Sequence, residues 1–147
     1  MSKTSDLWGS WVRLRDLAVN PCADCGKGVY QIRATLKNGW SVPIHRACGV
    51  DYEGILYIGE GNLCERVGYV TNAWKGDAKA HHQFTSTFTT YKRLDRIVDR
   101  EFLEVRWYEI DDCKQEEARL IDEYVHKFGD LPPGNNRPGQ ASKVAGN

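Results

Sequence analysis

The stretch at residues 54–67, Gly-Ile-Leu-Tyr-Ile-Gly-Glu-Gly-Asn-Leu-Cys-Glu-Arg-Val, constrains the fold more than any other part of the chain. Residues 55–58 form a short apolar run between turn signals, which is typical of a buried β-strand. The glycines after it predict a turn, and an asparagine cap followed by apolar residues on one face predicts a helix at 62–74. Two side chains do not suit a plain packing unit: Tyr57, between glycines, and Arg66, early in the helix. We therefore expect both to reach toward a functional site.

The remaining pattern predicts one small α/β (α+β) unit. A Lys-Asn-Gly sequence at residues 37–39 is a hairpin turn signal, so the alternating segments on either side of it should pair as antiparallel strands. The predicted strands lie at residues 28–36, 40–44, 55–58 and 102–110, and the predicted helices at residues 62–74, 85–98 and 111–128. This order favours a small, mostly antiparallel sheet with a three-stranded core, flanked by helices.

The chain of 147 residues has the length of one ordinary domain, and we assign residues 21–136 to that domain. Residues 1–20 form an N-terminal extension, in which apolar residues at three-residue spacing indicate a short helix. These residues are Trp11, Leu14 and Leu17. Residues 137–147 contain almost nothing to bury, and we expect this tail to be disordered.

Composition narrows the class of protein. No run of about 18 apolar residues is present to cross a membrane, and the first residues lack the apolar region of a secretion signal, so we expect a cytoplasmic protein. The five cysteines are then expected to be thiols or metal ligands rather than disulfides. The formal net charge of zero argues against nonspecific coating of nucleic acid. Residues 1–100 nevertheless hold 14 Lys and Arg against 10 Asp and Glu, which is compatible with a basic face.

Several motifs together resemble the signature of the GIY-YIG nuclease family. A Gly-Val-Tyr sequence ends at Tyr30 in one predicted strand, a Tyr-Ile-Gly sequence begins at Tyr57 in another, and Arg66 follows on the next helix. Glu117 on the last helix and a Pro-Pro-Gly-Asn sequence ending at Asn135 resemble the closing elements of that family. One such motif alone carries little information, whereas the whole set occurs here in the family's order.

The resemblance implies a GIY-YIG nuclease fold and a metal-dependent DNA endonuclease that hydrolyses phosphodiester bonds by in-line attack of water. It implies that Tyr30 acts as the base, that Tyr57 orients the water or the phosphate, and that Arg66 grips the phosphate. It further implies that Glu117 holds one Mg²⁺ or Mn²⁺ ion and that Asn135 supports the site by hydrogen bonds. A free phenol with a pKa of about 10 is almost wholly protonated at neutral pH. Tyr30 can therefore act as a base only beside cations.

The residues themselves favour Glu117 over its acidic neighbours. At about 100° per residue, Glu117 heads the apolar stripe that includes Ile121 and Tyr124. A buried carboxylate without a partner costs several kcal/mol, so this glutamate needs a cation. We favour a divalent ion beside DNA, and the alternative is a salt bridge to Arg66 or Arg106.

Two positions depart from the family pattern. Val29 replaces the isoleucine of the first motif, which is a conservative change in packing. Val70 stands one turn beyond the arginine, where the family often has a histidine. His81 is therefore the candidate for that role, with His82 beside it, and the alternative is that both are ordinary surface residues.

Four residues form two pairs with the spacing of zinc ligands: Cys22, Cys25, His45 and Cys48. If the predicted hairpin turn sets the strand register, Cys48 lies opposite Val29 and near Cys25. The four ligands would then converge at the open end of the hairpin and hold a structural zinc ion. The alternative is that the second pair lies in a plain loop. We interpret Cys64 and Cys113 as isolated core thiols.

The predicted partner is DNA. Basic residues on or near the two central helices are candidate phosphate contacts: Lys75, Lys79, Lys92, Arg93, Arg96 and Arg100. Such contacts supply affinity but little sequence information, and an ordinary solvated helix face is the alternative. A homo-oligomer or a larger DNA-processing complex stays open. The alternative function is a non-catalytic nucleic-acid-binding module that keeps this scaffold and uses zinc for rigidity.

Overall fold

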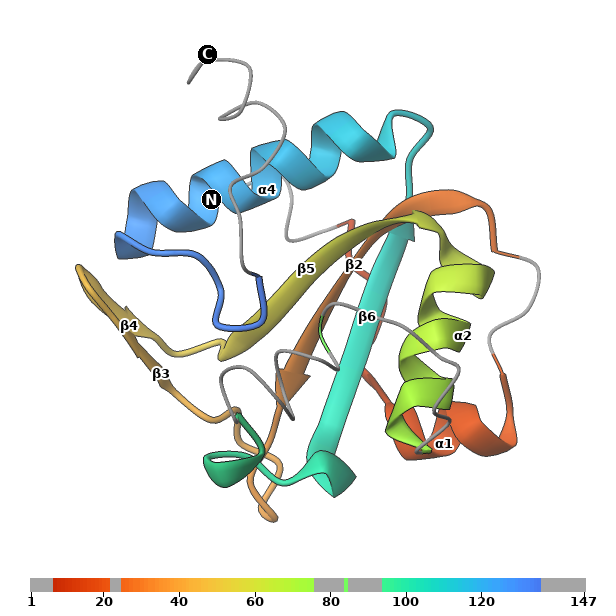
Figure 1. Cartoon of the computed structure of the whole chain (residues 1–147), viewed down its shortest axis with the longest axis horizontal. Coiled ribbons are helices and arrows are strands. Elements are labelled where there is room, and N and C mark those ends of the chain that lie inside the picture. Colours follow the sequence, from red (N-terminus) through yellow and green to blue (C-terminus); the bar gives the residue numbers. More distant parts are fainter. Residues whose placement is uncertain (1–6, 22–24, 76–83, 85–93, 136–147) are drawn as a thin grey trace.

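The computed structural model describes residues 7–21, 25–75, 84 and 94–135 (Figure 1). It has an α+β fold whose main sheet contains four strands in the order β1-β6-β2-β5, and each neighbouring pair is antiparallel. The elements are β1 (Val12–Arg13), α1 (Leu14–Val19), β2 (Lys27–Ala34), β3 (Ile44–Arg46), β4 (Gly49–Asp51), β5 (Ile55–Asn62), α2 (Leu63–Trp74), η2 (Leu94–Arg96), η3 (Arg100–Phe102), β6 (Leu103–Glu109) and α4 (Cys113–Phe128). The predicted small antiparallel sheet with flanking helices is confirmed.

Strand β2 lies at the centre of the sheet, because β5 and β6 pair with it along nearly its whole length. Strand β5 continues through its glycines to Asn62, which pairs with Lys27. The prediction that this strand ends at residue 58 in a turn was therefore wrong. Gly28 allows the close approach of β6, because a β-carbon there would overlap the carbonyl oxygen of Tyr108.

Helix α2 begins directly where β5 ends. The Asn62 side chain accepts a hydrogen bond from the backbone amide of Glu65 at 3.0 Å, which confirms the predicted cap. The apolar residues Leu63, Val67 and Val70 are buried, as their spacing predicts. The helix therefore packs its apolar face on the sheet at the point where the strand stops.

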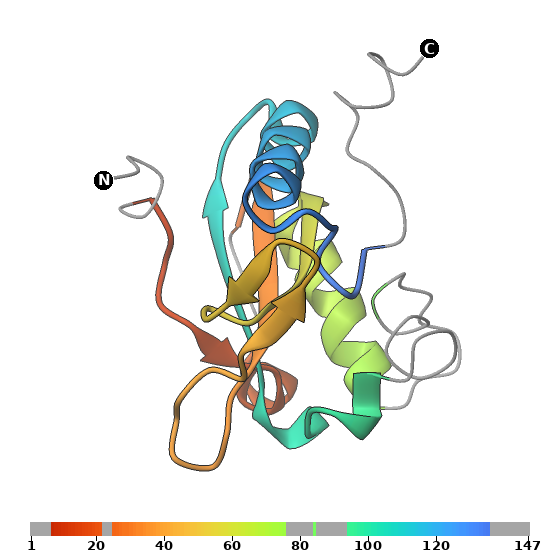
Figure 2. The same cartoon turned by 90° about the vertical axis from the view of Figure 1, so that its left-hand side faces the viewer.

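The two faces of the sheet pack against different elements. On one face, which we call the α2 face, Tyr30, Ile32 and Tyr57 pack with residues of α1 and α2. On the other, which we call the α4 face, Val29 and Ile58 pack with residues of α4. The edge-on view in Figure 2 shows α2 beside one face and the segment preceding β1 on the opposite side. Consecutive residues of β2, and of β5 from Tyr57 onward, therefore point into two separate environments.

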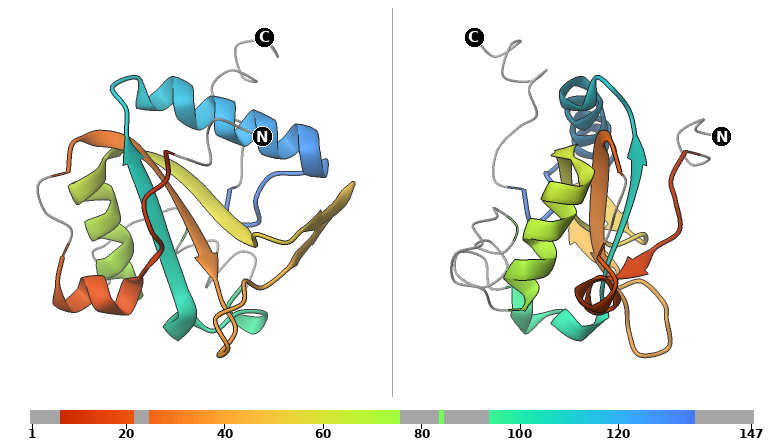
Figure 3. Two further views of the ribbon diagram at one scale, coloured as in Figure 1. Left: turned by 180° about the vertical axis from the view of Figure 1, so that it is seen from behind. Right: turned by 90° about the vertical axis from the view of Figure 1, so that its right-hand side faces the viewer.

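The N-terminal extension contributes to both faces. Leu14 and Leu17 of α1 are buried in the core of the α2 face, and Figure 3 shows α1 against one end of α2. Trp11 precedes the helix and packs on the α4 face, where the guanidinium groups of Arg33 and Arg106 lie 4.2 and 4.5 Å from the centre of its ring. The prediction that Trp11 shares a helical face with the two leucines was wrong, because β1 separates it from the helix.

The segment between β2 and β5 pairs only briefly with the end of β2 and then forms a hairpin of its own. Within the described residues, Thr35 and Ser41 form an isolated bridge around the predicted turn. Strand β3 then pairs with β4 in a separate two-stranded sheet. Backbone hydrogen bonds join Leu36 with Trp40 and Val42 with Ala34, so the predicted pairing of 28–36 with 40–44 is present near the turn. It was wrong for the rest of β2, because β5 occupies that edge from Arg33 backward.

Helix α4 ends at Gly129, as predicted. This glycine has a left-handed φ of 75°, and its amide donates to the carbonyl oxygen of Val125 at 2.7 Å. The chain then turns back toward β5, where the amide of Gly134 donates to the carbonyl oxygen of Leu56. The end of α4 and the following loop are thus fixed to the main sheet.

Two predicted segments lie mostly outside the described residues. Most of the helix predicted at 85–98 does so, and its described end contains the 3-10 turn η2. The predicted tail at 137–147 lies outside entirely. Among the helices of the described ranges, none combines the length and the apolar character that crossing a membrane requires.

Candidate functional site

Tyr30 and Tyr57 meet on the α2 face of the sheet. Their ring centroids are 5.9 Å apart, and only 1% of Tyr30 and 7% of Tyr57 are exposed. The ring of Phe84 lies against Tyr57, with 5.7 Å between the ring centroids. The two phenols therefore share one buried environment. Strand β2 contributes Tyr30 to it, and strand β5 contributes Tyr57.

Two glycines of β5 provide the space for the neighbouring side chains. A β-carbon at Gly59, which is paired with Tyr30, would lie 2.5 Å from the hydroxyl oxygen of that tyrosine. Gly61 has a positive φ of 132°, and a β-carbon there would lie 2.8 Å from Nε of Arg66. Residues two apart in a strand point to the same face. The Tyr30 ring and the Arg66 side chain therefore lie against adjacent bare positions of one strand, which accounts for the glycine pattern of the sequence.

Helix α4 approaches the same strand from its other side. The thiol of Cys113 donates to a carboxylate oxygen of Glu60 at 3.0 Å, which places the first turn of the helix beside β5 between the two glycines. Glu117 follows four residues later on the same side of the helix, and its side chain is half-buried. Its negative charge reaches Tyr30. The carboxylate is therefore near enough to Tyr30 to raise the pKa of its phenol.

The neighbouring Glu116 has different surroundings. Burial opposes its ionisation, but the hydrogen bond from Arg119 and the nearby Tyr108 outweigh that effect and lower the pKa of the carboxyl group. Burial in turn raises the pKa of Tyr108, and Glu116 raises it further. The two consecutive glutamates therefore serve different contacts, as the helical pattern predicts.

Three of the predicted residues act electrostatically on the fourth, Tyr30. Burial raises the pKa of the Tyr30 phenol well above its ordinary value, and the adjacent Tyr57 raises it further. The positive charge of Arg66 lowers this pKa, and the negative charge of Glu117 raises it. Tyr30 is therefore a neutral phenol at neutral pH in this arrangement, and its ionisation depends on the balance of the charges around it.

Asn135 holds β5 in place beside the tyrosines. Its Oδ1 accepts a hydrogen bond from the amide of Ile58, and its Nδ2 donates to the carbonyl oxygen of the same residue, each at 3.0 Å. The side chain is 5% exposed. Because Ile58 follows Tyr57 directly, this paired contact fixes the backbone behind that tyrosine. Asn135 thus makes hydrogen bonds behind the tyrosines, and its part in a catalytic site stays a prediction.

The predicted zinc ligands do not converge. The register that would place Cys48 opposite Val29 is wrong, because Val29 pairs with Glu60 and Tyr108. Cys48 lies in the exposed turn between β3 and β4, where its amide donates to the carbonyl oxygen of Phe128 at 2.8 Å. The hairpin that carries it, with His45 exposed in β3, thus packs at the end of α4.

Cys25 lies at the opposite end of β5, near the start of α2. Its amide donates to the sulfur of Cys64 at 3.1 Å, so Cys64 is not the isolated core thiol that we predicted. Cys22 lies outside the described residues. Within the described ranges, no group of three or more His, Cys, Asp or Glu side chains is placed to hold a metal ion. The converging four-ligand arrangement is therefore not supported.

Most of the predicted DNA contacts fall outside the described part of the chain. Lys75 is exposed at the end of α2, Arg96 is exposed in η2, and the guanidinium of Arg100 lies 5.3 Å from the ring centre of Trp74. The remaining predicted residues lie outside the described ranges: Lys79, His81, His82, Lys92 and Arg93. The basic interface and the histidine role stay predictions.

Asp51 is a buried carboxylate that we did not predict from the sequence. It is 2% exposed and accepts hydrogen bonds from the amides of Glu53, Gly54 and Ile55 and from the hydroxyl of Tyr124. Burial raises the pKa of Tyr124, and the charge of Asp51 raises it further. The Asp-Tyr-Glu-Gly sequence was an available turn signal, but nothing local pointed to the distant tyrosine.

The donor set around Tyr30 fits a hydrated divalent cation. Mg²⁺ usually keeps several waters and takes one or two carboxylates together with substrate phosphate, rather than a cage made only by protein. Glu117 supplies one hard oxygen ligand of this kind, and Arg66 supplies a fork suited to a phosphate. Comparison of the chain with protein-family models, with curated proteins and with solved structures finds no match. The function must therefore be inferred from this geometry.

Proposed function

We propose that this protein is a metal-dependent DNA endonuclease of the GIY-YIG type, which hydrolyses phosphodiester bonds by in-line attack of water. The observation that carries the proposal is the cluster around Tyr30, in which Tyr57, Arg66 and Glu117 all act on one phenol. These residues come from two strands and two helices that are far apart in the sequence. Packing alone gives no reason for a guanidinium, a carboxylate and two phenols to gather at the glycine positions of one strand.

The side chains divide the chemical work. Arg66 lies against Gly61 and is exposed, so it can grip a phosphate of DNA from solvent and offset the negative charge that develops on it. Tyr57 orients the attacking water or the phosphate from the neighbouring strand. Tyr30 takes the proton from the attacking water, and Arg66 favours the phenolate that results.

Glu117 would hold the cation at the edge of the phenol pair. When bound, one Mg²⁺ or Mn²⁺ ion neutralises charge on the phosphoryl oxygens and favours ionised groups beside it. The raised pKa of Tyr30 makes such a neighbouring positive charge necessary for the base role. Asn135 acts through Ile58 and keeps the backbone beside Tyr57 in position.

One observation favours the alternative of a non-catalytic nucleic-acid-binding module. Only 1% of Tyr30 is exposed, and Phe84 lies against the adjacent Tyr57. A substrate must therefore displace covering groups before it reaches the Tyr30 hydroxyl. A module that only binds DNA has no such requirement, since it needs an exposed Arg66 but not an accessible phenol.

The experiment compares DNA binding and DNA cleavage in the same variants. Plasmid DNA is incubated with Mg²⁺ or Mn²⁺ and with the wild type, Glu117→Gln or Glu123→Gln, and binding is followed by gel shift in parallel. Glu123 lies on the same helix, is exposed and pairs with Arg119, so its substitution is the matched control. The enzyme is supported if Glu117→Gln binds but does not cleave while Glu123→Gln does both. Binding without cleavage by the wild type in either metal supports the module instead.

A further inference from the structure

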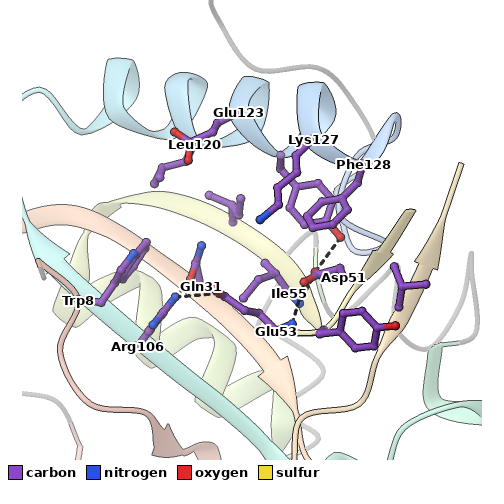
Figure 4. Close-up of a pocket in the computed structure, with 14 residues that line it drawn as sticks. Trp8, Gln31, Asp51, Glu53, Ile55, Arg106, Leu120, Glu123, Lys127 and Phe128 are labelled. Atoms are coloured by element: carbon purple, nitrogen blue, oxygen red, sulfur yellow. Dashed lines mark hydrogen bonds and ion pairs between the residues drawn. The ribbon is translucent and has the colours of Figure 1, made fainter. Parts of the chain in front are cut away.

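A cavity of about 420 Å³ lies on the α4 face of the sheet, away from the tyrosine pair. Figure 4 shows it between the strands and the second half of α4, with the β4–β5 turn at one end and Trp8 at the other. This volume is within the range of pockets that hold small ligands. Its apolar wall is formed by residues of the sheet and the helix: Ile55, Ile58, Leu120 and Phe128.

Gln31 presents an unused hydrogen-bond donor to this cavity. The side chain is only 7% exposed, and its Oε1 accepts a hydrogen bond from Nε of Arg106 at 2.9 Å. Because an arginine can only donate, this bond fixes which end of the amide faces Arg106. The Nε2 group therefore points into the cavity, as Figure 4 shows, and no acceptor for it occurs among the described residues. This donor is open to the cavity, where the acceptor of a ligand can pair with it.

Arg106 adds a partly desolvated positive charge beside that donor. Its guanidinium is stacked on the rings of Trp8 and Trp11, with 4.6 and 4.5 Å to the ring centres. Burial lowers the pKa of Arg106, and the charge of Arg33 lowers it further, while Glu53 opposes both. The contact to Glu53 is long, at 3.4 Å, and that carboxylate is 69% exposed. The charge of the guanidinium is thus only weakly compensated by the protein.

Lys127 provides a second positive charge from the opposite side. Its amino group points from α4 toward the cavity in Figure 4, and it lies 5.3 Å from the centre of the Phe128 ring. Two of the three acidic groups that line the cavity are already engaged. Asp51 accepts three backbone amides and a tyrosine hydroxyl, and Glu123 is paired with Arg119 at 2.9 Å. The third, Glu53, is mostly exposed and lies at the turn, 3.4 Å from Arg106. The groups that face a ligand inside the cavity are therefore the donors of Gln31, Arg106 and Lys127.

We propose that this cavity binds a small ligand that carries an oxyanion, a phosphate or a carboxylate, on an apolar body. The oxyanion accepts hydrogen bonds from Gln31 and Arg106 and faces Lys127, and the body lies on the aliphatic wall. Phosphate and carboxylate share the acceptor geometry that an arginine fork recognises. The site is on the opposite face of the sheet from the proposed nuclease cluster and does not depend on it.

The test measures binding of three probes of one shape: phenyl phosphate, benzoate and uncharged benzyl alcohol. Binding is followed by calorimetry and by the side-chain amide signal of Gln31 and the indole signal of Trp8 in ¹H–¹⁵N spectra. We expect at least one anion to bind with saturation and to shift both signals, and the alcohol to bind at least about tenfold more weakly. Preference for one anion identifies the head group. No saturable shift with either anion, or equal binding of the alcohol, overturns the proposal.

Two substitutions and one control locate the effect. Gln31→Glu keeps an acceptor for Arg106 but replaces the donor by a negative charge, so the anion should no longer bind. Lys127→Gln should weaken binding by about tenfold, and Lys114→Gln is the control, because Lys114 is exposed on the same helix and is not part of the cavity. Equal weakening by the two lysine substitutions would show only a general charge effect and would overturn the site. Unchanged thermal unfolding of the variants confirms that they are folded.

Discussion

The two faces of the β2–β5 pair show how one ladder supports two different environments. On the α2 face, Tyr30 and Tyr57 are buried together. The Tyr30 ring fills the space beside Gly59, where a β-carbon would collide with it. On the α4 face, the next residues along each strand, Gln31 and Ile58, line an open cavity. The first face is closed around groups that the protein itself supplies, and the second leaves donors without protein acceptors. Because successive side chains of a strand point to opposite faces, these two environments are only one residue apart in the sequence.

The largest expected effect concerns the two arginines, one beside each face. Arg66→Ala should reduce DNA cleavage by about a thousandfold, and Arg66→Lys by about a hundredfold, because a lysine lacks the planar fork. Arg106→Lys should change cleavage by less than about threefold, since it keeps the charge on the α4 face. Single-turnover cleavage rates of folded variants give these ratios. A comparable loss in both lysine variants would break the assignment of chemistry to the α2 face.

The next effect compares two glycines on the α2 side of the molecule. Gly59→Ala should lower the free energy of unfolding by about 2–3 kcal/mol, because the new methyl group collides with the buried Tyr30 ring. Gly68→Ala is the matched control: nothing lies within 4 Å of its β-carbon position in α2. It should raise stability by about 0.5–1 kcal/mol through helix propensity. Urea unfolding measures both, and a neutral Gly59→Ala would mean that the tyrosine does not rest on the strand as described.

A smaller loss is expected at the support of β5. Asn135→Ala removes both partners of the Ile58 backbone and should cost about 2 kcal/mol, because it leaves a buried amide and a buried carbonyl unpaired. Asn38→Ala is the control, since its side chain bonds only the exposed amide of Trp40, and it should cost less than about 1 kcal/mol. Denaturant unfolding distinguishes the two, and equal effects would remove Asn135 from its supporting role.

The smallest expected effect is a change with pH at Tyr30. A base whose pKa is raised is deprotonated in a small fraction at neutral pH, so kcat/KM for cleavage should rise by up to about tenfold per pH unit from neutral to alkaline pH. For stability the sign is opposite: the folded-state pKa lies above the unfolded one, so the stability contribution is complete below about pH 10 and is lost as the pH rises further. A rate that is independent of pH in the wild type would count against Tyr30 as the base.

The sequence was sufficient where local pattern and packing agree. The cap at Asn62 and the stop at Gly129 each follow from a local chemical requirement, and the structure has both. The choice of Glu117 followed from helical periodicity, which places side chains on faces before any tertiary contact is known. The roles of these residues in catalysis stay proposals.

The sequence was insufficient where a long-range partner decides the outcome. The hairpin after residue 36 was predicted from its turn, and its backbone bonds do form between Ala34 and Val42, but from Arg33 backward β5 takes the edge of β2 that a longer hairpin needed. The zinc prediction depended on that register and failed with it. Gln31 and Arg106 gave no sequence signal either, because neither a buried amide nor a stacked guanidinium has a characteristic spacing.

The most direct test of the central claim is the location of a bound Mn²⁺ ion by paramagnetic broadening of backbone amide signals. If Glu117 holds the cation beside the phenols, the amides of Tyr30, Gly59 and Glu117 should broaden strongly, and Glu117→Gln should abolish the effect. The amides of the β4–β5 turn, at the far end of β5, should change little. Broadening centred on that turn, or unchanged by Glu117→Gln, would contradict a cation site at the tyrosine pair.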